Sequence, residues 1–159
     1  MSLDLPSVKN IDGSSLRFAV VASRYNESLV DSLVSHASKT LTASGADAPT
    51  IERVPGAAEL PFAAATLAAQ KNFDAIIVIG VVIAGDTMHH EIIGESTAKS
   101  LLEVSLTHTV PVINGILVVN TQEQAEARAG EEINRGKEFA QAALEMAQFT
   151  KKWKTKPQK

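Results

Sequence analysis

The sequence predicts an α/β fold in which helices cover both faces of a four-stranded parallel sheet. Apolar, strand-like segments alternate along the chain with helix-like segments, which is typical of β-α-β units joined by right-handed crossovers. The most apolar segment, residues 75–84, is rich in Ile and Val and has no alternation with polar residues. Such a strand is expected at the centre of a parallel sheet, with both faces buried. Four strands between two helical layers make a flavodoxin-like three-layer α/β/α sandwich.

The first half of the chain is predicted to contain two strands and two helices. The strands span residues 16–22 and 49–54. The first helix begins after Asn26, its predicted N-cap, and apolar residues at helical spacing continue it to residue 45. The second helix, residues 59–71, is rich in alanine and tolerates Pro61, because proline is compatible with a first helical turn.

The second half is predicted to add two strands and three helices. The strands span residues 75–84 and 110–118. A helix over residues 88–109 has Asp86 or Thr87 as its N-cap, and a capping box at residues 121–124 opens a short helix that ends at Gly130. Residues 134–136 are predicted to form a turn. The apolar face of the last helix is expected to comprise Phe139, Ala142, Ala143, Met146, Ala147 and Phe149.

The chain is expected to fold as one domain over residues 16–150. Residues 1–15 are an N-terminal arm of the kind that often pairs with a neighbouring subunit. Residues 151–159 form a lysine-rich tail, which is predicted to fray. A domain of this length can bury a substantial core.

Composition narrows the classes of function. The chain has 159 residues, a formal net charge of -3 and no cysteine, so disulfides and thiolate sites are excluded. The basic residues outside the tail are scattered, which argues against nucleic-acid binding. The longest apolar run is about half of the roughly 20 residues that a membrane span needs. The first residues lack the features of a signal peptide, so we expect a cytoplasmic protein with no membrane contact.

The polar turns that follow the predicted strands are the candidate site, because open parallel sheets bind ligands beyond the carboxyl ends of their strands. These turns lie at Tyr25, at Gly56, at Asp86 and at residues 114–120. His89 follows a turn whose free amides attract anions, so it could transfer protons beside a bound anion.

Each candidate also has an ordinary structural interpretation. A histidine at a helix start is more often structural or exposed than catalytic. Arg128 could hold a phosphate through a fork of charge-assisted hydrogen bonds, but an exposed helical arginine is usually only solvated. Gly56 could be just a turn residue, and Glu59 a first-turn acid that the helix dipole favours.

Four motifs, in order along residues 17–146, resemble the lumazine synthase family of riboflavin biosynthesis. They are Arg24-Tyr25-Asn26, the segment Val-Pro-Gly-Ala-Ala-Glu-Leu-Pro at residues 54–61, the segment Gly-Val-Val-Ile-Ala-Gly-Asp-Thr-Met-His-His-Glu at residues 80–91, and the segment from Thr121 to Gly130. The resemblance implies a transferase that condenses 5-amino-6-(D-ribitylamino)uracil with 3,4-dihydroxy-2-butanone 4-phosphate. The products would be 6,7-dimethyl-8-ribityllumazine, phosphate and water, with no cofactor or metal.

The resemblance also implies roles for individual residues. His89 is the expected general acid/base, Arg128 is expected to act with it at the substrate phosphate, and Tyr25 is expected to stack on the pyrimidine. The phosphate would be bound by Gly85, Asp86, Thr87, Arg128 and, on a weaker match, Arg135. The pyrimidine and the ribityl chain would be bound by Tyr25, Asn26, Gly56, Ala57, Ala58, Glu59, Val81, Val82, Ile83 and Asn114.

Four positions depart from the family pattern. Ala84 stands where many members have Arg or Lys, and Ala58 where the residue is usually aromatic. Asn114 stands where Phe or Leu often reaches the neighbouring subunit's pocket. His90 replaces an aromatic residue and is expected to pack beside the site without a metal role. We expect a roomier or more polar pocket, with weaker affinity rather than loss of the chemistry.

The family places the site between adjacent subunits, so we expect a homopentamer, which in some members assembles further into a decamer or a shell of sixty subunits. The main alternative is a catalytically weak paralogue that binds flavin or lumazine as an oligomeric shell protein; Ala58, His90 and Asn114 are its best support. A flavodoxin-like electron carrier is a third hypothesis, although the phosphate loop expected after the first strand is missing.

Overall fold

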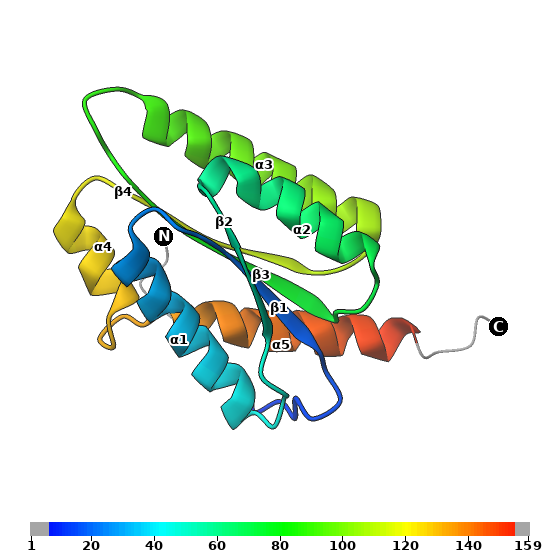
Figure 1. The fold of residues 1–159 in the computed structure, drawn as a ribbon. Helices are drawn as coiled ribbons and strands as arrows, with labels where there is room; N and C mark the ends of the chain where they lie inside the picture. Colours follow the sequence, from blue (N-terminus) through cyan, green and yellow to red (C-terminus); the bar gives the residue numbers. More distant parts are fainter. Residues whose placement is uncertain (1–6, 155–159) are drawn as a thin grey trace.

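A single parallel sheet forms the middle layer of the structure, a computed structural model in which residues 7–154 of the 159-residue chain are described. Its strands are β1 (Phe18–Ser23), β2 (Thr50–Val54), β3 (Ala75–Ile83) and β4 (Val112–Val119). All neighbours pair in parallel, in the spatial order β2-β1-β3-β4 (Figure 1). The predicted four-stranded parallel sheet is confirmed.

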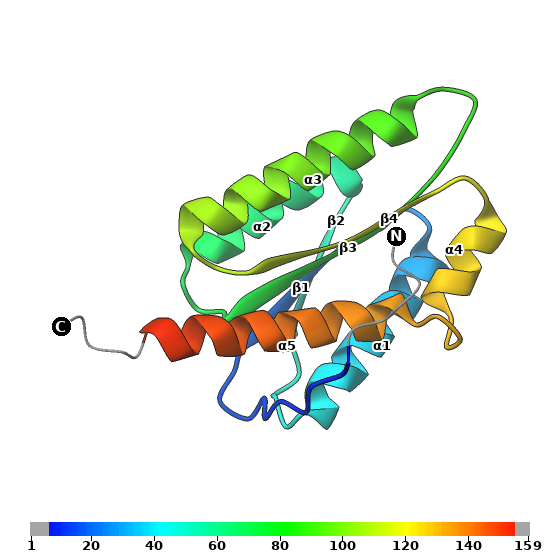
Figure 2. The ribbon, with the colours of Figure 1, turned by 180° about the vertical axis from the view of Figure 1, so that it is seen from behind.

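Helices cover both faces of this sheet, which confirms the three-layer sandwich. They are α1 (Glu27–Ala43), α2 (Leu60–Ala69), α3 (His89–His108), α4 (Gln122–Ala129) and α5 (Arg135–Lys154), and a short 3-10 turn, η1 (Ala57–Glu59), precedes α2. Helices α2 and α3 lie on one face, and α1, α4 and α5 lie on the other (Figures 1 and 2). No helix within residues 7–154 is long and apolar enough to cross a membrane.

The core is divided by the sheet into two apolar clusters. Successive residues of a strand point to opposite faces, so Val21 packs with Leu60 and Leu101 of α2 and α3. Its neighbour Val20 packs with the larger cluster, which includes Leu33 of α1 and residues of α5. Both faces of the central strands are therefore buried, which explains why β1 and β3 read as continuous apolar runs.

The strand order reverses direction at β1. The chain leaves β1 for β2 on one side and returns to β3 on the other. The crossover helices that follow β1 and β3 therefore diverge, and this leaves a crevice at the carboxyl ends of the two strands. Strand β3 is buried as far as Val81, whereas Val82 and Ile83 are half-buried, so the strand emerges from the core at the place where a ligand would bind.

Several element boundaries differ from the prediction. Strand β1 begins at Phe18 rather than at residue 16, and β4 begins at Val112 rather than at residue 110. Pro111 precedes β4, where its missing N–H is no disadvantage, and its carbonyl accepts a 2.9 Å hydrogen bond from the Ile76 amide. Asn114 is the third residue of β4 and so does not lie at the carboxyl end of the strand.

Two predicted helix caps form differently. Asn26 occupies the N-cap position of α1 in the left-handed conformation, but its side chain makes no cap hydrogen bond. The N-cap of α3 is Met88, so the prediction of Asp86 or Thr87 was wrong. At α4 the hydroxyl of the N-cap, Thr121, accepts a hydrogen bond from the Gln124 amide as predicted. The Gln124 side chain, however, accepts from the amide of Asn120, the residue before the N-cap, and not from the amide of the N-cap itself.

The start and the buried face of α5 also differ. The predicted turn at residues 134–136 was wrong from Arg135 onward, because α5 begins there and the Asn134 side chain accepts a 3.0 Å hydrogen bond from the Lys137 amide. Met146 and Phe149 are exposed rather than buried. The buried residues of α5 are Gly136, Ala140, Ala143, Leu144 and Ala147.

The predicted arm and tail lie partly outside the described residues. Within the arm, residues 7–15 form no strand, although Ile11 is buried in the larger apolar cluster. The tail continues α5 as far as Lys154. Residues 1–6 and 155–159 lie outside the described part of the chain.

We predict that Gly136→Ala destabilises the protein by about 1–3 kcal/mol, the usual effect of overpacking a core contact. An added Cβ would clash with the Leu33 carbonyl oxygen and lie 2.9 Å from the His36 Cβ, where α1 and α5 touch. Gly85→Ala is the control, because nothing lies within 4 Å of its added Cβ. Thermal unfolding at equal protein concentration provides the comparison. Equal midpoints for the two variants would contradict the close approach of α1 and α5.

Candidate active site

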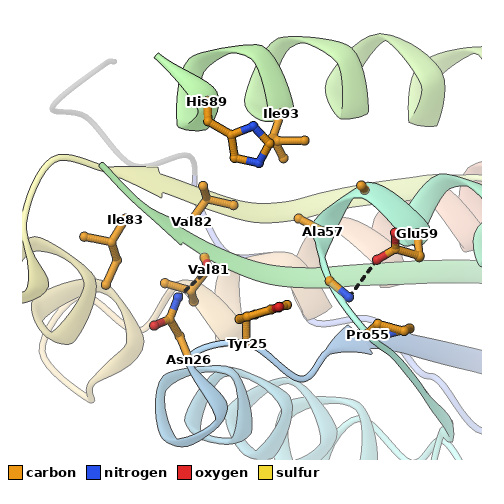
Figure 3. A pocket seen from close by; sticks show the side chains of 12 residues that line it. Tyr25, Asn26, Pro55, Ala57, Glu59, Val81, Val82, Ile83, His89 and Ile93 are labelled. Atoms are coloured by element: carbon orange, nitrogen blue, oxygen red, sulfur yellow. Dashed lines mark hydrogen bonds between the residues drawn. The ribbon is translucent and has the colours of Figure 1, made fainter. Parts of the chain in front are cut away.

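A cavity of about 580 Å³ lies at the carboxyl ends of β1, β2 and β3, between the start of α1, the 3-10 turn η1 and the start of α3. Its position at the strand-order reversal matches the usual place of a ligand crevice in an open α/β sheet. Figure 3 shows the cavity from close by. Its lining residues are Tyr25, Asn26, Pro55, Gly56, Ala57, Ala58, Glu59, Val81, Val82, Ile83, His89 and Ile93.

The loop after β1 provides the floor of the cavity. The Arg24 amide donates a 3.0 Å hydrogen bond to the Val54 carbonyl, which ties this loop to the end of β2. Asn26 has φ 56° and turns its side chain back, so that its Nδ2 donates to the Val81 carbonyl at 2.8 Å (Figure 3). The residue predicted to cap α1 therefore fastens the start of that helix to β3.

Gly56 allows the aromatic ring of Tyr25 to approach the backbone. A Cβ at position 56 would lie 3.4 Å from Tyr25 Cδ2 and 3.1 Å from Glu59 Oε2. The Gly56 amide donates a 2.8 Å hydrogen bond to Glu59 Oε2. One carboxylate oxygen of Glu59 is thus engaged within the turn, while the other has no partner among the described residues. Tyr25 is 72% exposed, so one side of its ring is open to a ligand.

The start of α3 provides the opposite wall. His89 and Ile93, one helical turn apart, face the cavity across from Tyr25 (Figure 3). The His89 amide donates to Thr87 Oγ1 at 3.4 Å. Within the described part of the chain, the amides of residues 85–88 donate no hydrogen bond, and these residues are exposed. Unpaired amides ahead of a helix attract anions.

The cavity combines an apolar lining with four polar side chains. The apolar part consists of Ala57, Ala58, Val81, Val82, Ile83 and Ile93, and the polar side chains belong to Tyr25, Asn26, Glu59 and His89. A flat heterocycle could lie between the tyrosine ring and the apolar wall, with an imidazole at hand to transfer protons. Among the described residues no group of three or more metal-ligating side chains could hold a metal ion.

Six predicted site residues do not line this cavity within one chain, and three of them are carried by β4, α4 and α5. Arg128, on α4, is half-buried, and its Nη1 donates a 2.9 Å hydrogen bond to the Gln124 carbonyl. Arg135 forms an ion pair with Glu138. Asn114 is exposed on β4, and its Oδ1 accepts from the Ile116 amide at 3.0 Å.

The predicted anion-binding turn behaves in the same way, since Gly85, Asp86 and Thr87 are exposed and lie outside the cavity lining. At the start of α4, residues of the same turn already accept hydrogen bonds from the backbone amides. Hydrogen bonds from the Glu123 backbone N–H and the Thr121 hydroxyl lower the pKa of the Glu123 carboxyl below its usual value. Of the two helix starts, the one before α3 therefore has more donors to offer to an anion.

Sequence reasoning did not name Pro55 and Ile93 as site residues. Pro55 lies in the motif that was identified, next to Gly56. Ile93 follows His89 by four residues, so the helical period places both on one face of α3. The four-residue spacing from His89 was visible in the sequence and would have predicted that Ile93 also lines the cavity.

A second cavity, of about 370 Å³, opens at the amino ends of the strands, opposite the first cavity, and has Lys71, Lys151 and Lys154 in its lining. Lys151 and Lys154 lie in the last turn of α5, and Lys71 follows the end of α2. Cations near a helix C-terminus interact favourably with the helix dipole. The Lys151 Nζ also donates a hydrogen bond to the Ser15 hydroxyl, which joins α5 to the segment before β1.

Comparison with known proteins identifies the family. The family model described as 6,7-dimethyl-8-ribityllumazine synthase matches residues 15–151. A protein of that name from Stenotrophomonas maltophilia (strain R551-3) is 48% identical over 135 residues, covering 83% of this chain and 87% of the relative. A second from Xanthomonas euvesicatoria pv. vesicatoria (strain 85-10) is 47% identical over 133 residues, covering 82% and 86% of the two chains.

A third relative of the same name, from Mycolicibacterium vanbaalenii, is 40% identical over 146 residues, covering 90% of this chain and 92% of the relative. The matched region includes every helix and strand described above, from β1 to all but the last residues of α5. The chain therefore belongs to the 6,7-dimethyl-8-ribityllumazine synthase family.

Proposed function

We propose that the protein condenses 5-amino-6-(D-ribitylamino)uracil with 3,4-dihydroxy-2-butanone 4-phosphate to give 6,7-dimethyl-8-ribityllumazine, phosphate and water. Membership of the family supports the reaction. The observation that carries the proposal to this chain is one cavity that brings together the Tyr25 ring from the loop after β1, the Glu59 carboxylate from η1 and the His89 imidazole from the start of α3. These groups match the needs of a flat pyrimidine, a polyhydroxyl chain and a proton-transfer step.

The uracil ring is proposed to stack on the open side of Tyr25. The ribityl hydroxyls then donate to the free carboxylate oxygen of Glu59 and contact the backbone of residues 56–58, which lies beside that ring. Asn26 and residues 81–83 complete the pyrimidine pocket. Ala58, where the family usually has an aromatic residue, leaves this pocket wider, so we expect a raised KM rather than a lost step.

The proposed reaction needs little from the protein beyond orientation and proton transfer. The amine of the uracil attacks the ketone and loses one water to form an imine. Phosphate then leaves by elimination, and after tautomerisation the ribitylamino nitrogen closes the ring with loss of a second water. Holding two reactants in register turns a bimolecular encounter into an effectively unimolecular step. His89 is proposed to move the protons, with the phosphate held at residues 85–87 and by Arg128.

We further propose that a second copy of the chain completes the site, in a homopentamer that acts in the cytoplasm. Arg128, Arg135 and Asn114 do not line the cavity of their own chain, so in this proposal they serve the cavity of a neighbour. The outer side of α3 supports self-association, since three large apolar side chains are mostly exposed there. They are Ile92, Leu102 and Leu106, at 60%, 62% and 73% exposure.

The assay that tests the function is formation of the fluorescent lumazine from the two synthetic substrates, with the uncatalysed rate subtracted. We predict turnover by the wild type and a loss of about 10² to 10⁴-fold in His89→Ala, the usual contribution of general acid/base catalysis. His108→Ala, at the far end of α3, is the control. An unchanged turnover number in His89→Ala would remove His89 from the mechanism. If the wild-type protein gives no more than the uncatalysed rate but still binds flavin, the result would favour the shell-protein alternative.

For Arg128→Ala we predict a steep rise in the concentration of butanone phosphate needed for saturation, because a charge-assisted phosphate contact is lost. Arg17→Ala, an exposed arginine just before β1, is the matched control. Co-expression with His89→Ala should restore part of the activity, since some sites in a mixed assembly combine an intact His89 with an intact Arg128. If saturation by butanone phosphate is unchanged in Arg128→Ala and co-expression with His89→Ala restores no activity, Arg128 does not bind the phosphate.

Light scattering at several protein concentrations tests the assembly. We predict a pentamer as the smallest stable species. Conversion of α3 residues Leu102 and Leu106 to Glu should shift the mass toward the monomer, because charges would then be buried in the interface. A monodisperse monomer for the wild-type protein would contradict the proposal of a shared site.

A further inference from the structure

The segment that presents His89 has few restraints of its own. Residues 85–89 and 91–92 are exposed, and an alanine Cβ at Gly85 would meet nothing within 4 Å. His89 is the first residue of α3, and the N-cap Met88 makes no side-chain cap hydrogen bond. The first turn of a helix lacks part of the normal hydrogen-bond ladder and frays readily. Something else must hold the imidazole of His89 in the cavity.

His90 is the exception in this exposed segment. Its side chain is only 15% exposed, and its Nδ1 lies 3.1 Å from the Thr87 carbonyl oxygen. Because a carbonyl oxygen only accepts, this contact requires a proton on Nδ1. The ring therefore folds back against the turn that precedes the helix, although its sequence neighbours face solvent.

Thr87 is bound by both histidines. Its carbonyl accepts from His90 Nδ1, and its hydroxyl accepts from the His89 amide at 3.4 Å. The two bonds join the turn to the first two residues of α3. The bond from His90 is the shorter one and comes from the side chain that is anchored by burial. It is the contact that can fix the direction from which His89 enters the cavity.

We propose that His90 is a positioning residue for the reaction, acting through Thr87 to hold His89 at the cavity wall. The inference rests on the proposed function for its effect on rate, and on the hydrogen bond to Thr87 for its effect on structure. Burial alone could be supplied by a phenylalanine. Only a side chain with a donor at the Nδ1 position holds the Thr87 carbonyl as well.

The experiment compares His90→Phe, which keeps an aromatic ring and removes the donor, with His90→Asn, whose Nδ2 can stand where Nδ1 was. We expect kcat to fall about threefold to tenfold in His90→Phe, the range for loss of one hydrogen bond. His90→Asn should stay within about twofold of wild type, with both KM values unchanged in either variant. His108→Phe makes the same chemical change at the other end of α3 and should have no effect.

A double-mutant cycle separates positioning from a general structural effect. In the His89→Ala background, His90→Phe should lower kcat no further, because the group that it positions is absent. An equal loss in both backgrounds would overturn the inference, as would equal rates for the Phe and Asn variants.

Hydrogen exchange of the peptide covering residues 84–93 tests the inference without turnover. Exchange should be faster in His90→Phe than in His90→Asn at equal thermal stability. If the wild-type protein does not make lumazine, the proposed function fails while this measurement still decides the role of His90. If it makes lumazine and exchange is the same in both variants, the proposed function stands and the role of His90 is refuted.

Discussion

The pairing of β3 with both β1 and β4 is the constraint on which the position of the cavity depends. The ladder to β4 runs from Ile76 to Ile83, while the ladder to β1 ends at Ile79. Beyond Ile79, β3 therefore keeps a strand neighbour on one side only. On the other side it faces the loop that carries Tyr25 and Asn26, and the Asn26 side chain bonds to the Val81 carbonyl. The apolar end of β3 forms the back wall of the cavity, and the missing strand neighbour leaves the opening.

Side-chain hydrogen bonds then bring the polar groups to this wall. The Asn26 side-chain amide donates a hydrogen bond to the Val81 carbonyl, 55 residues away in the chain, and one carboxylate oxygen of Glu59 accepts a hydrogen bond from the Gly56 amide. Each of these side chains is fixed by a bond at one atom and keeps another atom for a ligand. Such preorganisation lowers the entropy that substrate binding must overcome. The cavity is thus largely formed by contacts within one chain, and the proposed assembly would add Arg128, Arg135 and Asn114 of a neighbour.

Most of the fold could be predicted because apolar periodicity reflects burial directly. The uninterrupted Ile and Val run marked β3, and the alternation of strands with helices gave the three layers. Caps were less predictable. Asn26 has a long-range partner that outcompetes the local cap. Helix α3 starts one residue later than an N-cap at Thr87 would allow and two residues later than one at Asp86 would allow. Met146 and Phe149 were predicted to lie on the apolar face of α5, but they are exposed, because close contact with α1 at Gly136 favours a buried face made mainly of small residues.

The candidate site divides in the same way. Cavity-lining residues after β1 and β2 and at the start of α3 could be predicted from position and resemblance, because parallel strands end on the same side of the sheet, whereas Gly85, Asp86 and Thr87 after β3 lie outside the lining. The position of a residue relative to the strand ends does not place Arg128, Arg135 and Asn114 at the cavity. In the proposed assembly they reach the cavity of a neighbouring chain, and contacts between chains cannot be read from one sequence. Ile93 was missed although its spacing from His89 is helical.

The placement of the aromatic residues has an optical consequence. The chain has one tyrosine and one tryptophan. Tyr25 borders the first cavity, whereas Trp153 lies on the last turn of α5, next to Phe149, in the part of the helix that borders the second cavity. A flat ring bound in the first cavity would therefore contact the tyrosine directly, while the tryptophan lies at the opposite end of the strands. The native chain thus carries a separate chromophore at each end of its strands.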